Sequence, residues 1–204
     1  MALITVYTAE PGKGKTQAAL TRIGRAKAVF FCPTPLDKNK LLNRLDFIYA
    51  RELLLLKPDE LASFQKRFPQ FRCILGYDEA HLLQDFMGEE WAGYVFVLND
   101  LPQLVPQQKD FQYVVQFIAG IRHRDCTVMI TTQRVLGVTP PYVRVIADEI
   151  LQVGPLVAQD EARTLYMMGG SSKYPLFKDF YAAISKNPPY SIFVVKGLDT
   201  PSAA

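Results

Sequence analysis

The stretch Thr8-Ala9-Glu10-Pro11-Gly12-Lys13-Gly14-Lys15-Thr16-Gln17 directly follows an apolar run. That run, Leu3–Tyr7, has the β-branched and aromatic content of a core strand, and residues 17–20 begin a helix pattern. A glycine-rich loop between a strand and a helix can turn successive backbone N–H groups toward a phosphate. The sequence therefore predicts a phosphate-binding loop with a nucleoside triphosphate as its ligand.

Individual residues of this loop have predicted tasks. Lys15 is expected to reach the β- and γ-phosphates, and the Thr16 hydroxyl is expected to ligate Mg²⁺. The pattern G-x-x-x-x-G-K-[ST] has glycine at the position where this chain has Ala9. Alanine costs little at that position if the backbone φ there is negative. The alternative is a surface turn rich in glycine and lysine. The predicted nucleotide-binding residues are Pro11, Gly12, Lys13, Gly14, Lys15, Thr16 and Gln17.

A second acidic element is predicted at residues 73–79, where a short apolar run ends in Asp78 and Glu79. A strand buried on both faces has this pattern, and its carboxyl end opens onto the ligand crevice of a parallel sheet. Asp78 is the predicted Mg²⁺ ligand, and Glu79 is the predicted catalytic residue that orients or deprotonates the attacking water. The alternative is a strand followed by an acidic helix start.

Composition and charge fit one enzyme-sized domain. The 204 residues are 49% apolar, and the net charge of +3 permits contact with nucleic acid without requiring it. The three cysteines (Cys32, Cys73 and Cys126) have no metal-ligand spacing and are expected to be buried thiols in a reducing compartment. The first residues lack the pattern of a signal peptide, and no apolar run approaches the length of a membrane span.

Strand and helix patterns alternate along the chain, which predicts an α/β fold with a mostly parallel central sheet flanked by helices. Residues 1–198 are expected to form one domain and 199–204 a flexible tail. Residues 47–56 fit either a helix or an added strand, and residues 88–107 could not be placed. Strands are predicted at 3–9, 28–32, 73–78, 126–132, 149–153 and 191–195, and helices at 16–25, 38–44, 59–68, 80–86, 108–121 and 159–167.

A third group of candidate residues surrounds the strand at 126–132. If that strand lies beside the Asp78 strand, Gln133 emerges next to the γ-phosphate, where its amide can sense that phosphate and the attacking water. Arg122 and Arg124 precede the same strand and lie too far away to serve their own site. Either arginine could instead reach the nucleotide of a neighbouring subunit as an arginine finger in trans. The alternative is that Gln133 caps a strand and the arginines are solvated loop charges.

These motifs carry a family resemblance. The segments Asp78-Glu79-Ala80-His81, Ile121-Arg122-His123, Val128 to Arg134 and Pro140 to Asp148 resemble the FtsK–HerA superfamily of DNA-pumping ATPases, over about residues 3–153. The size and motif set are similar to those of genome-packaging ATPases of viruses with an internal membrane and double jelly-roll capsid proteins.

The resemblance implies a RecA-like P-loop NTPase domain that hydrolyses ATP with Mg²⁺ and works as a ring oligomer. It implies translocation of viral double-stranded DNA into a preformed capsid, with contacts to the DNA backbone rather than to base sequence. Capsid vertex or internal-membrane proteins are the implied partners, and the implied location is the host cytoplasm, transiently at the assembling virion. The residue roles it implies agree with those above, with Arg122 as the first candidate for the finger and Arg124 as the second.

Other functions also fit the motifs. A small nucleotide or nucleoside kinase would use the same loop but would need a lid with several arginines. A nucleotide-switched assembly factor would bind ATP and hardly hydrolyse it. A helicase that shares the Asp78–His81 box would need two such domains, and a filamentous-phage-type assembly ATPase would need a membrane anchor.

Contacts with DNA are the least determined part of the prediction. A translocating ring holds the phosphate backbone with Lys and Arg on loops that face its pore. A solvated helix face is the alternative for any basic cluster. The candidates are Lys38, Lys40, Arg44, Lys66 and Arg67, together with the loop Gly169–Lys173, which is expected to be flexible.

Overall fold

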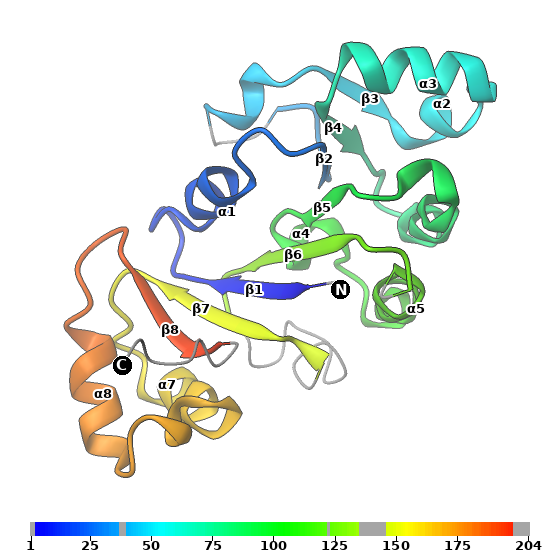
Figure 1. Ribbon diagram of the computed structural model, residues 1–204. Helices are drawn as coiled ribbons and strands as arrows, with labels where there is room; N and C mark the ends of the chain where they lie inside the picture. Colours follow the sequence, from blue (N-terminus) through cyan, green and yellow to red (C-terminus); the bar gives the residue numbers. More distant parts are fainter. Residues whose placement is uncertain (1–2, 37–39, 122, 135–145, 198–204) are drawn as a thin grey trace, which may run out of the picture.

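The computed structural model describes residues 3–36, 40–121, 123–134 and 146–197. One eight-stranded sheet runs through the molecule in the order β3-β4-β2-β5-β6-β1-β7-β8, flanked by helices (Figure 1). Every neighbouring pair is parallel except β7 and β8, which are antiparallel. The predicted α/β class with a mostly parallel central sheet is therefore confirmed. The predicted tail 199–204 lies outside the described residues.

The predicted strands are present except that the one predicted at 73–78 occupies Gln70–Ile74, and the chain adds β3 and β5. The strands are β1 (Ile4–Thr8), β2 (Ala28–Cys32), β3 (Phe47–Tyr49), β4 (Gln70–Ile74), β5 (Val95–Leu98), β6 (Thr127–Thr132), β7 (Glu149–Val153) and β8 (Ile192–Lys196). The α-helices are α1 (Lys15–Ile23), α2 (Ala50–Leu54), α3 (Pro58–Arg67), α4 (Leu101–Leu104), α5 (Phe111–Ile121), α7 (Gln159–Met168) and α8 (Phe177–Ser185). The 3₁₀ segments are η1 (Leu42–Arg44), η2 (Ala80–Met87), η3 (Glu89–Trp91), η4 (Gln108–Asp110) and η5 (Gly170–Ser172).

Several predicted elements differ from the structure. The ambiguous segment 47–56 contains both a short strand and a short helix, β3 and α2. The unplaced segment 88–107 contains β5 and α4. The predicted flexible loop at 169–173 contains η5, and a Cβ at Gly170 would lie only 2.4 Å from the Phe180 ring, so this turn packs tightly on α8.

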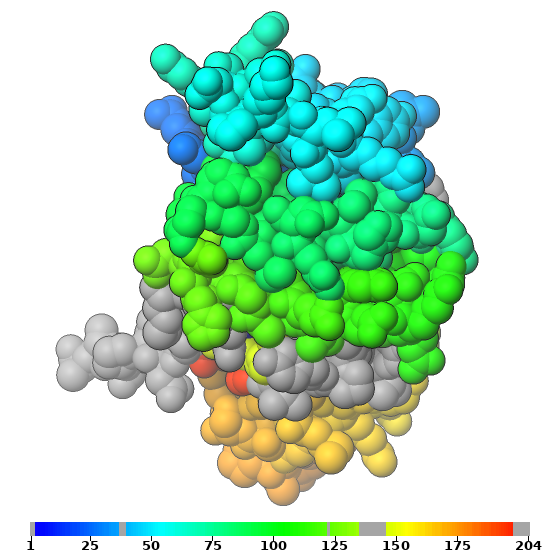
Figure 2. All heavy atoms as spheres, turned by 90° about the vertical axis from the view of Figure 1, so that its right-hand side faces the viewer, coloured from blue at the N-terminus to red at the C-terminus, as the bar shows by residue number. Residues whose placement is uncertain are grey.

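The sheet separates two apolar layers, because successive strand residues point to opposite faces. Val29 and Phe31 of β2 pack into the larger layer with α5 and η2, while Phe30 and Cys32 pack with α1 on the other face. In Figure 1, α1 and α5 lie on opposite sides of the sheet. Figure 2 shows the α5 side, where residues of α2 and α3 lie above those of η2 and α5, with the α7 region below.

The strand that precedes Asp78 and Glu79 ends earlier and lies elsewhere than predicted. β4 ends at Ile74, and the chain turns at Gly76 before either carboxylate. β6 pairs with β1 and β5, whereas β4 pairs with β2 and β3. The predicted position of Gln133 assumed that the strand at 126–132 lies beside the strand that precedes Asp78. This assumption is wrong, because β2 and β5 lie between β6 and β4.

All three cysteines are free and buried, as expected. Burial raises the pKa of the Cys73 thiol well above its usual value and also raises the pKa of Cys126. Among the described residues, no helix is long and apolar enough to cross a membrane.

Arg72 in β4 holds together the connection between β2 and β3. It is 4% exposed, and its guanidinium donates hydrogen bonds to Leu45 O (3.0 and 3.1 Å), Pro35 O (2.5 Å) and Asn43 Oδ1 (3.1 Å). The guanidinium carbon also lies 5.4 Å from the centre of the Phe47 ring. A buried cation with this many acceptors stabilises the connection, since its loss would leave the carbonyls without donors.

We expect Arg72→Ala to lower the free energy of unfolding by about 3 kcal/mol, because it removes several buried hydrogen bonds at once. Arg67→Ala is the matched control, because Arg67 is exposed and its guanidinium carbon lies 5.0 Å from the centre of the Phe68 ring. The control should cost less than about 0.5 kcal/mol. Denaturant unfolding measures both, and equal effects would contradict the structural role of Arg72.

Candidate functional site

The loop between β1 and α1 has the backbone of a phosphate cradle. Gly12 and Gly14 have φ of 76° and 89°, in the region that only glycine adopts without strain. Gly14 is the N-cap of α1, and its carbonyl accepts the first helical hydrogen bond, from Ala18 N at 2.8 Å. A helix N-terminus and a turn of inward N–H groups favour an anion at this position.

Ala9 fits the loop in spite of its departure from the motif. It is buried, and it is not among the described non-glycine residues with positive φ. Its N–H donates to Thr132 O at 3.3 Å, which joins the start of the loop to the end of β6. The small side chain is therefore tolerated, as predicted for a negative φ.

A polar network fixes α1 to the sheet below the loop. Arg22 of α1 forms a 2.6 Å ion pair with Glu149 of β7, and the Thr5 hydroxyl donates to the same carboxylate at 2.8 Å. Hydrogen bonding to Glu149 contributes to a raised pKa of Arg22, against the lowering effect of burial. The helix that carries Lys15 and Thr16 is thus held against β1 and β7.

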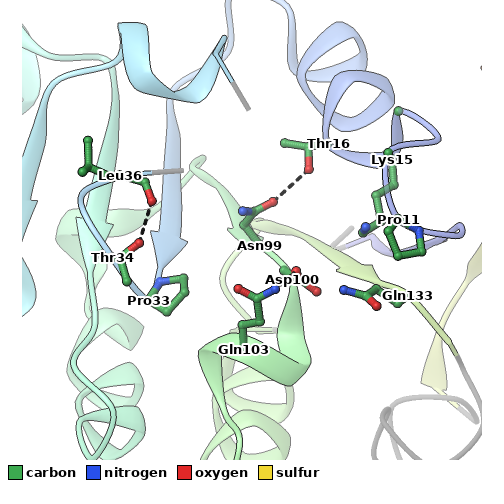
Figure 3. Close-up of a pocket in the computed structure, with 12 residues that line it drawn as sticks. Pro11, Lys15, Thr16, Pro33, Thr34, Leu36, Asn99, Asp100, Gln103 and Gln133 are labelled. Atoms are coloured by element: carbon green, nitrogen blue, oxygen red, sulfur yellow. Dashed lines mark hydrogen bonds between the residues drawn. The ribbon is translucent and has the colours of Figure 1, made fainter. Parts of the chain in front are cut away.

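A cavity of about 500 Å³ opens beside the loop, a volume typical of small-molecule sites. Its walls come from the loop, the end of β2, the end of β5 and the end of β6. Among the described residues that line it, Asp100 is the only carboxylate and Lys15 the only cation. The lining residues are Pro11, Gly12, Gly14, Lys15, Thr16, Pro33, Thr34, Leu36, Asn99, Asp100, Gln103 and Gln133 (Figure 3).

Asn99 connects the loop with the two neighbouring strands. It follows β5 directly and is 3% exposed. Its Oδ1 accepts hydrogen bonds from the hydroxyls of Thr16 (3.1 Å) and Thr131 (3.3 Å). The hydroxyl predicted to ligate Mg²⁺ is therefore positioned by an amide of β5, as the dashed line in Figure 3 shows.

Asp100 brings an incompletely satisfied carboxylate to the cavity. Its backbone is left-handed (φ 52°, ψ 63°), and its N–H donates to Thr131 Oγ1 at 2.7 Å. Gln103 Nε2 donates to Oδ2 at 2.6 Å, whereas Oδ1 is buried without a hydrogen-bond partner. A buried carboxylate oxygen without a partner is costly unless a cation or donor joins it. Together with the Thr16 hydroxyl and the Asn99 amide oxygen, it fits a Mg²⁺ ion, which prefers one or two carboxylates and phosphate oxygens.

Gln133 also lines the cavity, although β6 has other neighbours than the prediction assumed. It follows β6, which lies between β5 and β1. Figure 3 shows Gln133 across from Asp100 on the same side of the loop. The structure therefore brings Lys15, Thr16 and Gln133 together with Asn99 and Asp100, and not with Asp78 and Glu79.

Asp78 and Glu79 lie outside the cavity lining. Asp78 is exposed, and its carbonyl contacts His81 Nδ1 at 3.1 Å. The Glu79 carboxylate accepts Gly76 N–H at 2.7 Å and forms an ion pair with Arg51 of α2. These contacts stabilise the turn after β4, which corresponds to the alternative of an acidic helix start.

Arg124 precedes β6, at the edge of the sheet opposite the loop. Arg124 pairs with the Glu89 carboxylate in η3, and both side chains are accessible. Because β6 runs from Thr127 to Thr132 beside β1, Arg124 cannot serve the cavity of its own chain. Arg122 lies outside the described residues.

The sequence contained a signal for the missed pair. Val95-Phe96-Val97-Leu98 is an apolar run rich in β-branched and aromatic residues, and it ends in Asn99-Asp100. It has the same form as the run before Asp78 and Glu79. Only the strand order, which places β5 next to β6, distinguishes the two.

No protein-family model and no curated protein sequence matches the chain. Solved structures match it over nearly the whole length. The genome packaging NTPase B204 from Sulfolobus turreted icosahedral virus 2, in complex with AMP, has a TM-score of 0.59 and 14% identity, with 97% of this chain and 98% of that chain covered. B204, the DNA-packaging ATPase of Sulfolobus turreted icosahedral virus, has a TM-score of 0.59 and 12% identity, with coverage of 97% and 100%. The chain has the fold of these packaging NTPases.

A protein outside the packaging group matches equally well. VirB4 of Thermoanaerobacter pseudethanolicus has a TM-score of 0.58 and 9% identity, with 98% of this chain and 90% of that chain covered. The P-loop NTPase fold expected from the sequence resemblance is therefore confirmed.

The two loop glycines provide a test of the loop geometry. Both have positive φ, but a Cβ at Gly12 meets nothing within 4 Å, whereas a Cβ at Gly14 would lie 2.8 Å from Tyr190 Cδ1. We expect Gly12→Ala to cost about 1 kcal/mol of unfolding free energy without nucleotide, and Gly14→Ala clearly more. Adding Tyr190→Asn should remove the additional destabilisation caused by Gly14→Ala. It should leave the cost of Gly12→Ala unchanged. Equal costs for the two single variants would refute the close approach of Tyr190.

Proposed function

We propose that this protein is a Mg²⁺-dependent ATPase motor that moves viral double-stranded DNA into a preformed capsid as a ring oligomer. The observation that carries the proposal is the cavity that joins the phosphate loop to Asn99, Asp100 and Gln133. Full-length likeness in fold to the packaging NTPase B204 supports the packaging role. The proposal includes capsid vertex or internal-membrane proteins as partners, and the host cytoplasm at the assembling virion as the location.

The residues divide the chemistry between them. The backbone from Gly12 to Thr16 binds the phosphates, with Lys15 on the terminal ones, and Pro11, Lys13 and Gln17 complete the loop. Mg²⁺, when bound by Thr16 and Asp100, would neutralise charge that develops on the transferring phosphate. Asn99 orients the Thr16 hydroxyl. Asp100 and Gln133 are placed on one side of the loop, where they can hold a water in line with the terminal phosphate.

In this proposal, Asp100 rather than Asp78 and Glu79 supplies the carboxylate that binds Mg²⁺ and activates the water. Asp100 lines the cavity and has one buried carboxylate oxygen without a hydrogen-bond partner, whereas the Glu79 carboxylate already contacts Gly76 and Arg51. A trans arginine remains part of the proposal, from Arg122 or Arg124. To serve as the arginine finger, Arg124 must leave its ion pair with Glu89 and contact the nucleotide of the neighbouring subunit.

DNA contact is proposed for two groups of exposed cations. Lys40 and Arg44 are exposed and lie in the connection that begins with the wall residues Pro33 and Thr34. Lys66 and Arg67 are exposed at the end of α3. Such side chains suit contacts with phosphates, which carry no sequence information. Lys38 lies outside the described residues.

The test of the function is steady-state ATP hydrolysis with Mg²⁺, with and without long double-stranded DNA, at two salt concentrations. We expect turnover that DNA stimulates and that salt weakens, because backbone contacts release counterions. Lys15→Ala should abolish turnover, since it removes the charge on the transferring phosphate. Turnover that is indifferent to DNA would contradict the motor and favour a kinase, and binding without turnover would favour an assembly factor.

A second experiment decides which carboxylate activates the water. We expect Asp100→Asn to reduce kcat by about 100-fold or more while ATP still binds, because general-base catalysis contributes on that order. Glu79→Gln is the matched control, also a carboxylate-to-amide change, and should change kcat less than about threefold.

The readouts are single-turnover hydrolysis and ATP affinity for each variant, with the unfolding midpoint as a folding control. The reverse result, with loss of turnover only in Glu79→Gln, would return the role to the residue after β4. Loss of ATP binding in Asp100→Asn without a slower turnover of the ATP that does bind would mean that Asp100 serves Mg²⁺ binding alone and does not activate the water.

A further inference from the structure

Tyr190 is an aromatic residue in a conformation that aromatic residues rarely adopt. Its φ is +63°, a region that costs most side chains about 1–2 kcal/mol, and its side chain is 70% exposed. A bulky residue with such a backbone points to a constraint of function when the surroundings hold it in place. Turn formation alone would favour Gly or Asn at this position.

The surroundings hold this turn firmly. Asn187 Nδ2 donates to Gly154 O (3.0 Å) and to Ser191 O (2.9 Å), and Ser191 N donates to Pro188 O (3.1 Å). Gly154 N donates to Ser191 O at 2.8 Å, which joins the turn to the end of β7. The position of Tyr190 is thus set by a polar network, independent of contacts made by its own ring.

The ring of Tyr190 lies against the phosphate loop. A Cβ on Gly14 would be 2.8 Å from its Cδ1, and a Cβ on Gly154 would be 3.6 Å from Lys13 Cβ. The turn before β8 and the end of β7 therefore flank the loop on one side. β6 and β5, which carry Gln133 and Asn99, flank it on the other side, because β1 lies between β6 and β7.

This arrangement fixes the direction of a bound nucleotide. The terminal phosphate must face Asp100 and Gln133, so the nucleoside leaves the loop on the opposite side, toward β7 and β8. An exposed aromatic face next to Gly14 is then in reach of the base. We propose that Tyr190 stacks on the nucleobase and so discriminates nucleoside triphosphates from bare polyphosphate. The proposal deepens the nucleotide site described above and depends on it, but not on DNA translocation.

The test compares two ligands that differ in the base. Affinities of Mg²⁺-ATP and of Mg²⁺-tripolyphosphate are measured by calorimetry for the wild type, Tyr190→Asn and Tyr190→Phe. Asn suits the left-handed backbone, so Tyr190→Asn removes the ring while keeping the turn. We expect it to weaken ATP about tenfold or more, the order of one base–aromatic stack, and to leave tripolyphosphate unchanged. Tyr190→Phe should keep the wild-type affinity for ATP within about twofold, since the ring remains.

Each other outcome overturns the proposal in a recognisable way. An equal loss for both ligands would mean that the ring only supports the loop, and no loss for ATP would mean that the base lies elsewhere. Lys15→Ala distinguishes an error in the role of Tyr190 from an error in the nucleotide site itself. This variant should bind both ATP and tripolyphosphate more weakly. If the wild type binds neither ligand, the phosphate-loop assignment itself is wrong.

Discussion

Three neighbouring parallel strands, β5, β6 and β1, end at one edge of the sheet, and the candidate site depends on this constraint. Parallel pairing aligns Leu98 with Ile130 and Thr8 with Thr132, so the residues that follow each strand emerge at similar heights. The loop after β1, the amide after β6 and the Asn–Asp pair after β5 therefore meet without any long side chain. A shift of one strand in this order would separate the phosphate loop from the carboxylate that faces it.

Hydrogen bonds from threonine hydroxyls fix the positions of the residues at the ends of these strands. Thr16 and Thr131 both donate to Asn99, and the Thr131 oxygen accepts the N–H of Asp100. Polar groups in a protein interior are costly when unpaired and rigid when paired. The hydrogen bonds that pair the buried polar groups at the ends of β5 and β6 thus also orient the Thr16 hydroxyl. They hold Asp100 in its left-handed backbone conformation. Fold stability and the shape of the site depend on the same hydrogen bonds.

The sequence was sufficient for features that depend on local chemistry. The loop could be predicted because glycines with positive φ, a lysine and a threonine follow a strand pattern within ten positions, and Gln133 could be predicted from the end of a clear apolar run. The place of Asp100 beside the loop could not be predicted, because the runs before Asp78 and before Asn99 look alike locally. Their difference is whether the strand joins β6 or the outer side of β2, which long-range pairing decides. The position of Tyr190 beside Gly14 could not be predicted either, because the two residues are separated by most of the chain.

An amide at position 99 beside a carboxylate at position 100 has a physical rationale. Two adjacent carboxylates at this depth would repel each other, and a 3% exposed charge at position 99 would be costly to bury without a bound cation. Asn99 keeps an acceptor oxygen for the two threonine hydroxyls and carries no charge. The negative charge is then concentrated on Asp100, a residue of the cavity lining whose buried Oδ1 has no hydrogen-bond partner. The site therefore stays ordered before nucleotide binds, while its one charged acceptor is left for the ion or water that accompanies the phosphates.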